Sequence, residues 1–252
     1  MAPFEDYIFN TFAAEINSWE GVWVQDVYAL GFLIYLEDQD LRLPTVGLVY
    51  NTDQQWEKCN ANVLSKFTDS AKVPEQLEGI REETKWLFDY WLQHDLWVRD
   101  QLVMVAKSRY GPRLDPEGAL LCRARIDSLN LWYTDEEEDA DFDRTLAMGG
   151  RITDIFDAHC VRVAQRLHTR GIIGAKFGRP IPIVFHGPER ERRLAWCARD
   201  ANPPGLAKEF EQYVLKGCNP ESPTECARYY EDGRQAAAVA DAVPAQKEDA
   251  DA

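Results

Sequence analysis

The feature that most constrains this chain is the segment from Asp26 to Asn51, DVYALGFLIYLEDQDLRLPTVGLVYN. Two runs rich in β-branched and aromatic residues flank a polar stretch from Glu37 to Asp40, and the second run begins at Pro44. This pattern is typical of a β-hairpin. Because most of the remaining chain has helical periodicity, we expect the hairpin to supply the sheet on which the helices pack.

Apolar residues recur at spacings of three and four along much of the chain, which predicts helices. The expected helices span residues 3–16, 54–67, 75–107, 152–170, 189–199 and 205–216, and the expected strands span residues 24–36, 45–50 and 180–186. The two prolines of the last strand restrict it to a sheet edge or to a strand start. Residues 119–133 fit either a strand or a helix, and the glycines at 171, 174 and 178 predict a flexible turn. We therefore predict an α+β fold with a small, mainly antiparallel sheet flanked by helices.

The sequence of 252 residues, 45% of them hydrophobic, is long enough for one large domain. Such a domain buries roughly 70–75% of its unfolded surface. We assign residues 1–218 to it, and residues 219–252 to an acidic, largely disordered tail. The longest apolar run, residues 27–36, is far shorter than the ~20 residues of a membrane helix. The first residues also lack a secretory signal, so we expect a cytoplasmic protein with no membrane partner.

The net charge of −15 is concentrated in two segments. Residues 135–143 hold seven acids and no base, and the residues from 219 onward hold eight acids and three bases. The rest of the chain is nearly neutral. This charge argues against nucleic-acid binding and favours a basic protein partner. Residues 134–143 are expected to form a loop or the lead of the next helix.

The motifs of common enzymes are absent: the chain has no GxxxxGK[ST], GxGxxG, GxSxG or HExxH sequence. His159 and His168 are nine residues apart on one expected helix, so they face opposite sides and cannot share a metal ion. We therefore predict no metal site and no cofactor, and we assign no catalytic residue. The six cysteines have no tight framework and are expected to be reduced, with a Cys218–Cys226 pair as the alternative.

Five residues are candidates for binding. Arg162 and Arg166, followed by Arg170, form a basic stripe that either docks an anion or is the solvated outer face of a helix, paired in part with the acidic run. Arg179, in the rigid sequence FGRPIP, is either a structural arginine that bonds loop carbonyls or a recognition residue. The remaining candidates, Asn51 and His186, would lie with Arg179 near the Trp-rich helix if the protein were an enzyme.

Several segments together resemble an uncharacterised family of roughly 200–250-residue proteins, mostly bacterial with some fungal members. These segments are DVYALGFLIY, LPTVGLVYNT, KWLFDYWLQHDL and LHTRGIIGAKFGRPIPIVFH, and the resemblance covers about residues 20–215. Related small domains occur near polymorphic-toxin loci as immunity proteins. The resemblance implies an α+β fold and a binding role, and it assigns no catalytic residue.

The leading hypothesis is a cytosolic protein-binding module, of the immunity kind, with a basic partner. The alternative is an enzyme of unrecognised type whose site would gather Asn51, Arg179 and His186 in a pocket with a buried carboxylate. A third alternative is a purely structural subunit with a large exposed apolar patch.

Overall fold

The computed structural model describes residues 3–36, 40–65, 74–91, 103–105, 116–187 and 192–216. The predicted tail, residues 37–39 of the polar stretch, and Cys218 and Cys226 lie outside the described residues. The strands are β1 (Val27–Leu36), β2 (Pro44–Thr52), β3 (Val103–Val105) and β4 (Ile183–His186). The helices are α1 (Pro3–Ser18), α2 (Asp53–Ser65), α3 (Pro74–Trp86), α5 (Pro116–Ser128), α6 (Asp135–Ala140), α7 (Phe142–Thr169), α8 (Ile172–Phe177), α9 (Arg192–Ala201) and α10 (Lys208–Lys216), with short 3-10 helices η1 (Val22–Asp26) and η3 (Phe88–Tyr90).

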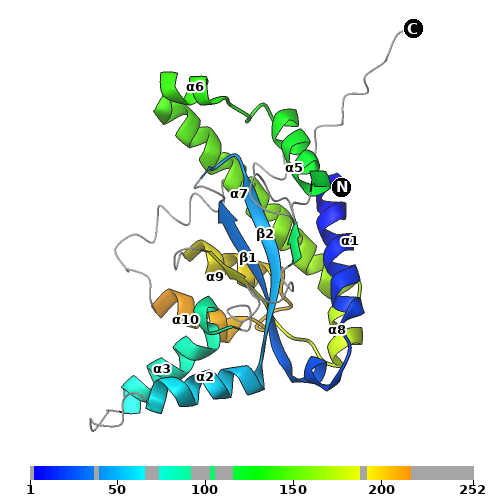
Figure 1. Cartoon of the computed structure of the whole chain (residues 1–252), viewed down its shortest axis with the longest axis vertical. Helices are drawn as coiled ribbons and strands as arrows, with labels where there is room; N and C mark the ends of the chain where they lie inside the picture. Colours follow the sequence, from blue (N-terminus) through cyan, green and yellow to red (C-terminus); the bar gives the residue numbers. More distant parts are fainter. Residues whose placement is uncertain are drawn as a thin grey trace.

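The four strands form one sheet in the order β3-β2-β1-β4 (Figure 1). The predicted hairpin pairs β1 with β2 antiparallel, with Gly31 opposite Val49. β3 is antiparallel to β2, and β4 is parallel to β1 at the edge of the sheet. The predicted α+β fold with a mainly antiparallel sheet is therefore confirmed, and so is the edge position of the PIPIVFH segment.

Both faces of the central strand β1 are buried. Phe32 packs on one face against Phe12 of α1 and Phe185 of β4, with ring centroids 5.0 and 5.5 Å away. The preceding residue, Gly31, points to the other face. A Cβ atom at Gly31 would lie 2.7 Å from Val49 Cγ2 and about as close to an aromatic neighbour, so this position has no room for a side chain.

The helices form two groups around the sheet. The 28-residue α7 packs against α1 and α9, and α9 packs against β4. The antiparallel pair α2 and α3 lies at the far end of the molecule from α6, and α3 reaches α10 (Figure 1). The start of α7 and the whole of α6 extend past the ends of the strands on the opposite side.

The predicted helix over residues 75–107 is wrong. α3 ends at Trp86, Leu87 is extended, and Val103–Val105 form a strand. The break lets Trp86 and Trp91 find different partners: Trp86 contacts Phe210 of α10, whereas Trp91 packs beside the sheet. One uninterrupted helix would not allow the Trp91 Nε1–H to donate back to the carbonyl oxygen of Lys85, as it does at 2.9 Å.

Other boundaries also differ from expectation. The helix expected from residue 152 begins ten residues earlier, at Phe142, and the acidic run before it forms α6. The segment that fitted either a strand or a helix is helical as α5. The expected flexible turn is the short helix α8. Gly171, with φ of 73°, follows the end of α7, and Gly178, with φ of 65°, ends α8 itself.

Candidate functional site

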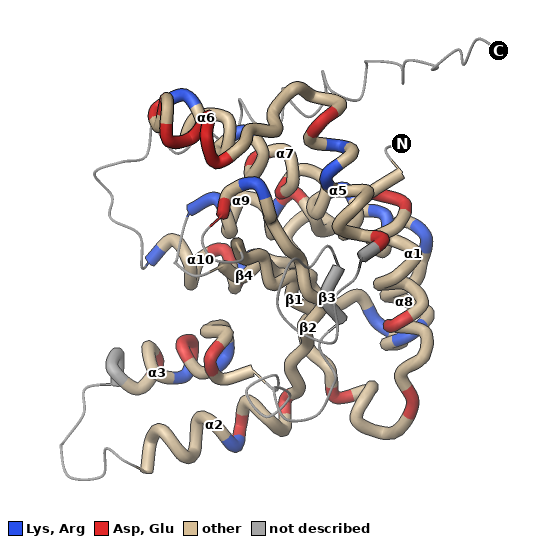
Figure 2. The backbone as a smooth tube through the Cα atoms, turned by 45° about the horizontal axis from the view of Figure 1, so that its top comes forward, with Lys and Arg blue, Asp and Glu red and all other residues tan. Residues whose placement is uncertain are grey.

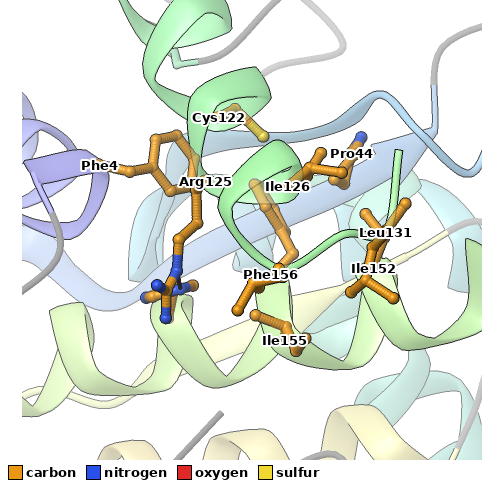
Figure 3. A pocket seen from close by; sticks show the side chains of 11 residues that line it. Phe4, Pro44, Cys122, Arg125, Ile126, Leu131, Ile152, Ile155 and Phe156 are labelled. Carbon is orange, nitrogen blue, oxygen red and sulfur yellow. Dashed lines mark hydrogen bonds between the residues drawn. The ribbon is translucent and has the colours of Figure 1, made fainter. Parts of the chain in front are cut away.

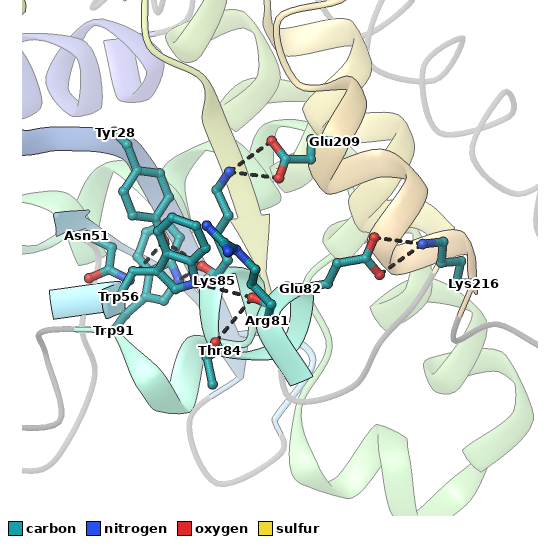
Figure 4. A network of polar contacts seen from close by, with 10 residues as sticks. All are labelled: Tyr28, Asn51, Trp56, Arg81, Glu82, Thr84, Lys85, Trp91, Glu209 and Lys216. Carbon is teal, nitrogen blue, oxygen red and sulfur yellow. Dashed lines mark hydrogen bonds and ion pairs between the residues drawn. The ribbon is translucent and has the colours of Figure 1, made fainter. Parts of the chain in front are cut away.

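Asn51 and His186 lie in one buried cluster of aromatic side chains between the sheet and α3 (Figure 4 labels Asn51 and its neighbours). The Asn51 Nδ2 group donates to the Tyr28 hydroxyl at 2.9 Å, and that hydroxyl donates to the Lys85 carbonyl oxygen at 2.6 Å. The Trp91 ring, 6.3 Å from Tyr28, links this chain to His186. Asn51 thus orients Tyr28, which fastens the end of α3 to β1.

His186 is surrounded by rings. It is 5% exposed, and its ring centroid is 4.5 Å from that of Trp91, 5.4 Å from Phe88 and 5.7 Å from Phe210. Within the described residues its Nε2 atom has no hydrogen-bond partner. Burial in these apolar surroundings lowers the pKa of His186 to about 3, so the imidazole is neutral near pH 7.

Lys85 connects α3 to three other elements around the same cluster (Figure 4). Its ammonium group lies 2.7 Å from Glu209 Oε1 of α10, and 5.0–5.6 Å from the rings of Tyr28, Trp56 and Trp86. Cation–π contacts of this kind stabilise by about 0.5–2 kcal/mol each. Through these contacts, Lys85 connects α3 to α2, α10 and β1. Its ammonium group already has an ion-pair partner in Glu209.

Arg179 does not join this cluster. It is an exposed residue whose Nη2 group donates to the Val27 carbonyl oxygen at 3.2 Å, where η1 meets β1. The sequence left two alternatives for Arg179, a structural arginine that bonds loop carbonyls or a recognition residue. This contact is of the structural kind. The structure therefore brings Asn51 and His186 together and leaves Arg179 apart from them.

Arg162 and Arg166 face α1. Arg162 Nε donates to Glu5 Oε2 at 2.8 Å, and Arg166 Nη1 donates to Asp6 Oδ1 at 2.5 Å. Burial by itself would raise the pKa of Glu5, but the hydrogen bonds from His159 and Arg162 outweigh it and lower that pKa to about 2. Both arginines thus pair with acids of α1, and not with the acidic run.

Three cavities of the described chain hold none of the enzyme candidates. A small apolar cavity of about 20 Å³ lies between α5 and α7, and Figure 3 shows Arg125 crossing it toward α7. A polar hollow of about 330 Å³ lies between α7 and α9, where Arg193 pairs with Asp157 at 2.5 Å. A larger groove lies near the start of α2. Asn51, Arg179 and His186 line none of the three.

The acidic run, in contrast, forms a defined surface that we call the acidic arm, residues 134–146. Thr134 begins it: the Thr134 hydroxyl accepts from the Glu137 backbone N–H at 3.2 Å, and the Glu137 carboxylate accepts from the Thr134 N–H at 2.9 Å. This capping box starts α6. Asp141 then caps α7 by accepting from the Arg144 N–H at 3.1 Å. The four acids of the first turn of α6 lie at its positive end, which favours the helix.

The base of the arm is tightly packed. Arg42, just before β2, lies 2.7 Å from Asp135 Oδ1 and donates to Asp40 as well. Its hydrogen bond with Asp40 is the main reason that the pKa of Arg42 is raised. On α7, a Cβ atom at Gly149 would meet Leu41 Cβ at 2.5 Å, so the two backbones approach too closely for any side chain. These contacts join the base of the arm to the segment before β2.

The outer surface of the arm carries charges without partners. Figure 2 shows acidic residues gathered on α6 at one end of the molecule. Asp135 pairs with Arg42 and Glu137 with Arg144. The other five acids of the arm make no ion pair within the described residues: Glu136, Glu138, Asp139, Asp141 and Asp143.

Two large apolar side chains are exposed among these acids. Phe142 is 60% exposed and Leu146 is 49% exposed, and they lie one turn apart on α7. Residues at this spacing share one helix face. An apolar centre with a charged rim is the usual make-up of a protein–protein contact. The sequence analysis missed this site, although the capping-box pattern of Thr134 and Glu137 was a readable signal for α6.

None of the helices in the described ranges is both long and apolar enough to span a bilayer. Among the same residues, no three His, Cys, Asp or Glu side chains converge as metal ligands would. No protein-family model matches this chain, and the comparisons with curated proteins and with solved structures found no significant match.

Proposed function

We propose that this protein is a binding module that captures a basic protein through the acidic arm. The supporting observation is the pair of exposed apolar side chains, Phe142 and Leu146, set among five carboxylates that no cation of the described chain neutralises. The carboxylates attract and orient a basic partner during encounter. The apolar pair then supplies the area that is removed from water on docking.

The occupant that fits best is an amphipathic helix with lysines or arginines beside an apolar face. Such a helix lays its apolar residues onto an apolar stripe, and its cations reach the flanking acids. An immunity protein that neutralises a basic toxin domain would use a surface of this kind, in line with the family resemblance of residues 20–215. We place the protein in the cytoplasm, where Cys59, Cys122, Cys160 and Cys197, which form no disulfide within the described residues, would stay reduced.

The test uses a synthetic peptide of lysine and leucine at helical spacing, and a scrambled peptide of the same composition. The full chain should bind the first peptide more tightly than the second, because only the first presents an apolar face. Raising the salt from about 0.1 M to about 1 M shortens the screening length from about 10 to about 3 Å, and should weaken binding strongly. Equal binding of both peptides, or binding that salt leaves unchanged, would rule out this mode of capture.

Two sets of variants locate the contact. Phe142→Ser with Leu146→Ser should weaken binding on the order of tenfold or more, since each anchor of an interface contributes at least about 1 kcal/mol. Neutralising three acids of the arm should mainly slow association and flatten the salt dependence. The charge-matched control is Glu20→Gln, Glu57→Gln and Glu117→Gln, three exposed acids outside the arm.

A further inference from the structure

A second site lies at the other end of α1. A groove of about 700 Å³ opens where the carboxyl ends of α1 and β2 meet η1 and the start of α2. This volume is within the usual range of ligand sites. Its lining is formed by Glu15, Trp19, Trp23, Asp26, Tyr50, Thr52, Gln54, Gln55 and Lys58. None of these residues belongs to the acidic arm.

Three aromatic rings form one wall of the groove. Trp23 stacks on Tyr50 with centroids 4.9 Å apart and an interplanar angle of 25°. Trp19 packs against both, at 5.6 Å from Trp23 and 4.9 Å from Tyr50. Because the three rings are in contact with each other, no ligand fits between them. They form a continuous aromatic surface, which we call the platform. The faces of such rings carry negative electrostatic potential and attract cations.

Two carboxylates accompany the platform, and each is held by one oxygen. Glu15 Oε1 accepts from Trp19 Nε1 at 2.9 Å, and Asp26 Oδ2 accepts from the Gln54 backbone N–H at 3.0 Å. The second oxygen of each carboxylate has no hydrogen bond within the described residues. Both side chains are therefore oriented before any ligand arrives.

These carboxylates differ from their counterparts elsewhere in the chain. Partly or fully buried acids such as Glu5, Asp40 and Asp157 are each paired with an arginine. Glu15 and Asp26 are half-buried, yet no Arg or Lys of the described residues forms an ion pair with either. The cation of the lining, Lys58, is exposed on α2 and pairs with neither acid. The groove thus contains two half-buried carboxylates and no cation of the described residues that pairs with them.

We propose that this groove binds the guanidinium group of an arginine side chain presented by a polypeptide. A guanidinium is planar, so it stacks flat on the Trp23–Tyr50 platform, and its five N–H donors reach two carboxylates at once. A compact ammonium lacks that flat face. A phosphate-bearing ligand would meet Glu15 and Asp26 as like charges. Beside the platform, the exposed Gln54 side chain offers hydrogen bonds to a peptide backbone.

The experiment follows the backbone and indole N–H signals of the full chain by NMR during titration with blocked Gly-Arg-Gly. Two matched tripeptides carry lysine or citrulline, which is the neutral isostere of arginine. The arginine peptide should give saturable shifts at the indoles of Trp19 and Trp23, with binding at least about tenfold tighter than the lysine peptide. The citrulline peptide should give none. An equal response to citrulline, or no response to arginine at a large excess, would overturn the proposal.

Two variants keep the test specific. Glu15→Gln retains an oxygen that can accept from Trp19 Nε1, so it removes the charge while keeping the fold. It should weaken arginine binding at least about fivefold, whereas Glu57→Gln, an exposed acid of α2 outside the lining, should leave it unchanged. Equal binding by Glu15→Gln and the unaltered chain would show that the carboxylate is not used. Shifts caused by a neutral oligosaccharide, without any caused by arginine, would likewise reject the proposal.

Discussion

The two ends of α7 use charge in opposite ways. In the second half of the helix, Arg162 and Arg166 are matched one for one by Glu5 and Asp6 of α1, and the Glu5 carboxylate is only 4% exposed. At the start, the acids around Phe142 face outward without cations. The first arrangement fastens two helices of this chain together. The second leaves carboxylates without ion pairs and apolar side chains exposed to water. Both features are needed in a surface that binds another molecule.

The energetics differ accordingly. A buried ion pair carries a large desolvation penalty, so removing one partner is far more damaging than its net contribution suggests. Exposed charges contribute little to folding. The comparison therefore predicts large stability effects at Glu5 and small ones on the arm, with binding effects in the reverse order.

The largest expected effect comes from Glu5→Ala. This change leaves His159 and Arg162 without their carboxylate in a buried site, and it should lower the free energy of unfolding by about 3–5 kcal/mol. Urea denaturation measures it, with Glu20→Ala on the exposed loop after α1 as the control. A loss below about 1 kcal/mol would mean that the α1–α7 pairs do not hold the helices together.

The next test asks which group sets the acid sensitivity of the fold. The folded pKa of His186, about 3, is below its ordinary value of 6.5, so the unfolded chain takes up the proton first. Stability should then fall as the pH drops below 6.5, by up to about 1.4 kcal/mol per pH unit. Glu5 adds little between about pH 7 and 5, because its carboxylate is ionised there in both states: the ordinary pKa of 4.5 applies to the unfolded chain and the lowered pKa of about 2 to the folded one.

The unaltered chain and His186→Gln are denatured at about pH 7, 6 and 5. The difference between their pH slopes gives the contribution of His186 to the acid sensitivity of the fold. The variant should be less sensitive to acid, whatever its absolute stability at pH 7. The residual slope reports His159 and His168, whose pKa values are also lowered by burial. Identical slopes for the two proteins would show that His186 is not kept neutral by its aromatic surroundings.

A smaller effect tests how the arm is joined to the body. Gly149→Ala would push a methyl group into Leu41 and should cost about 1–3 kcal/mol through overpacking. Gly150→Ala, at the next position of the same helix, meets nothing within 4 Å and should stabilise by roughly 0.5–1 kcal/mol. Thermal unfolding of the two variants checks the sign. Equal signs would indicate that Leu41 can move away and that the arm is loosely attached.

The smallest stability effect is expected on the arm itself. Glu136→Gln, Asp139→Asn and Asp143→Asn together should change the free energy of unfolding by less than about 0.5 kcal/mol per site, as is usual for surface substitutions. Phe142→Ser should also be tolerated, because its ring is mostly in water already. Denaturant midpoints measure both. A large destabilisation would show that the arm is structural and would remove the contrast between the two ends of α7.

Sequence reasoning was most successful where the pattern is local. The hairpin of β1 and β2 followed from two runs of β-branched and aromatic residues. The prolines before Ile183 predicted a sheet edge or a strand start, and β4 lies at the edge. The helix expected through Trp91 was wrong, because the helical spacing of its indoles did not reveal that they contact different elements. Tertiary contacts overrode the local periodicity there.

The candidate site depended on contacts that a single sequence does not display. The partners of Arg162 and Arg166 are about 160 positions away along the chain, on α1. The exposure of Phe142 became visible only once α7 was seen to start there and to extend past the sheet. The acidity of the segment was apparent from composition. Its helical form could be predicted only from the order of the residues, through the capping box of Thr134 and Glu137.

Amide hydrogen exchange of the full chain, with and without the basic amphipathic peptide, tests the central claim most directly. We predict that the peptide slows exchange in α6 and the first turns of α7, from about residue 135 to 146, and leaves the α1–α7 contact around Glu5 unchanged. Slower exchange anywhere else in the described chain, with the arm unaffected, would contradict the proposal that this surface captures a basic partner.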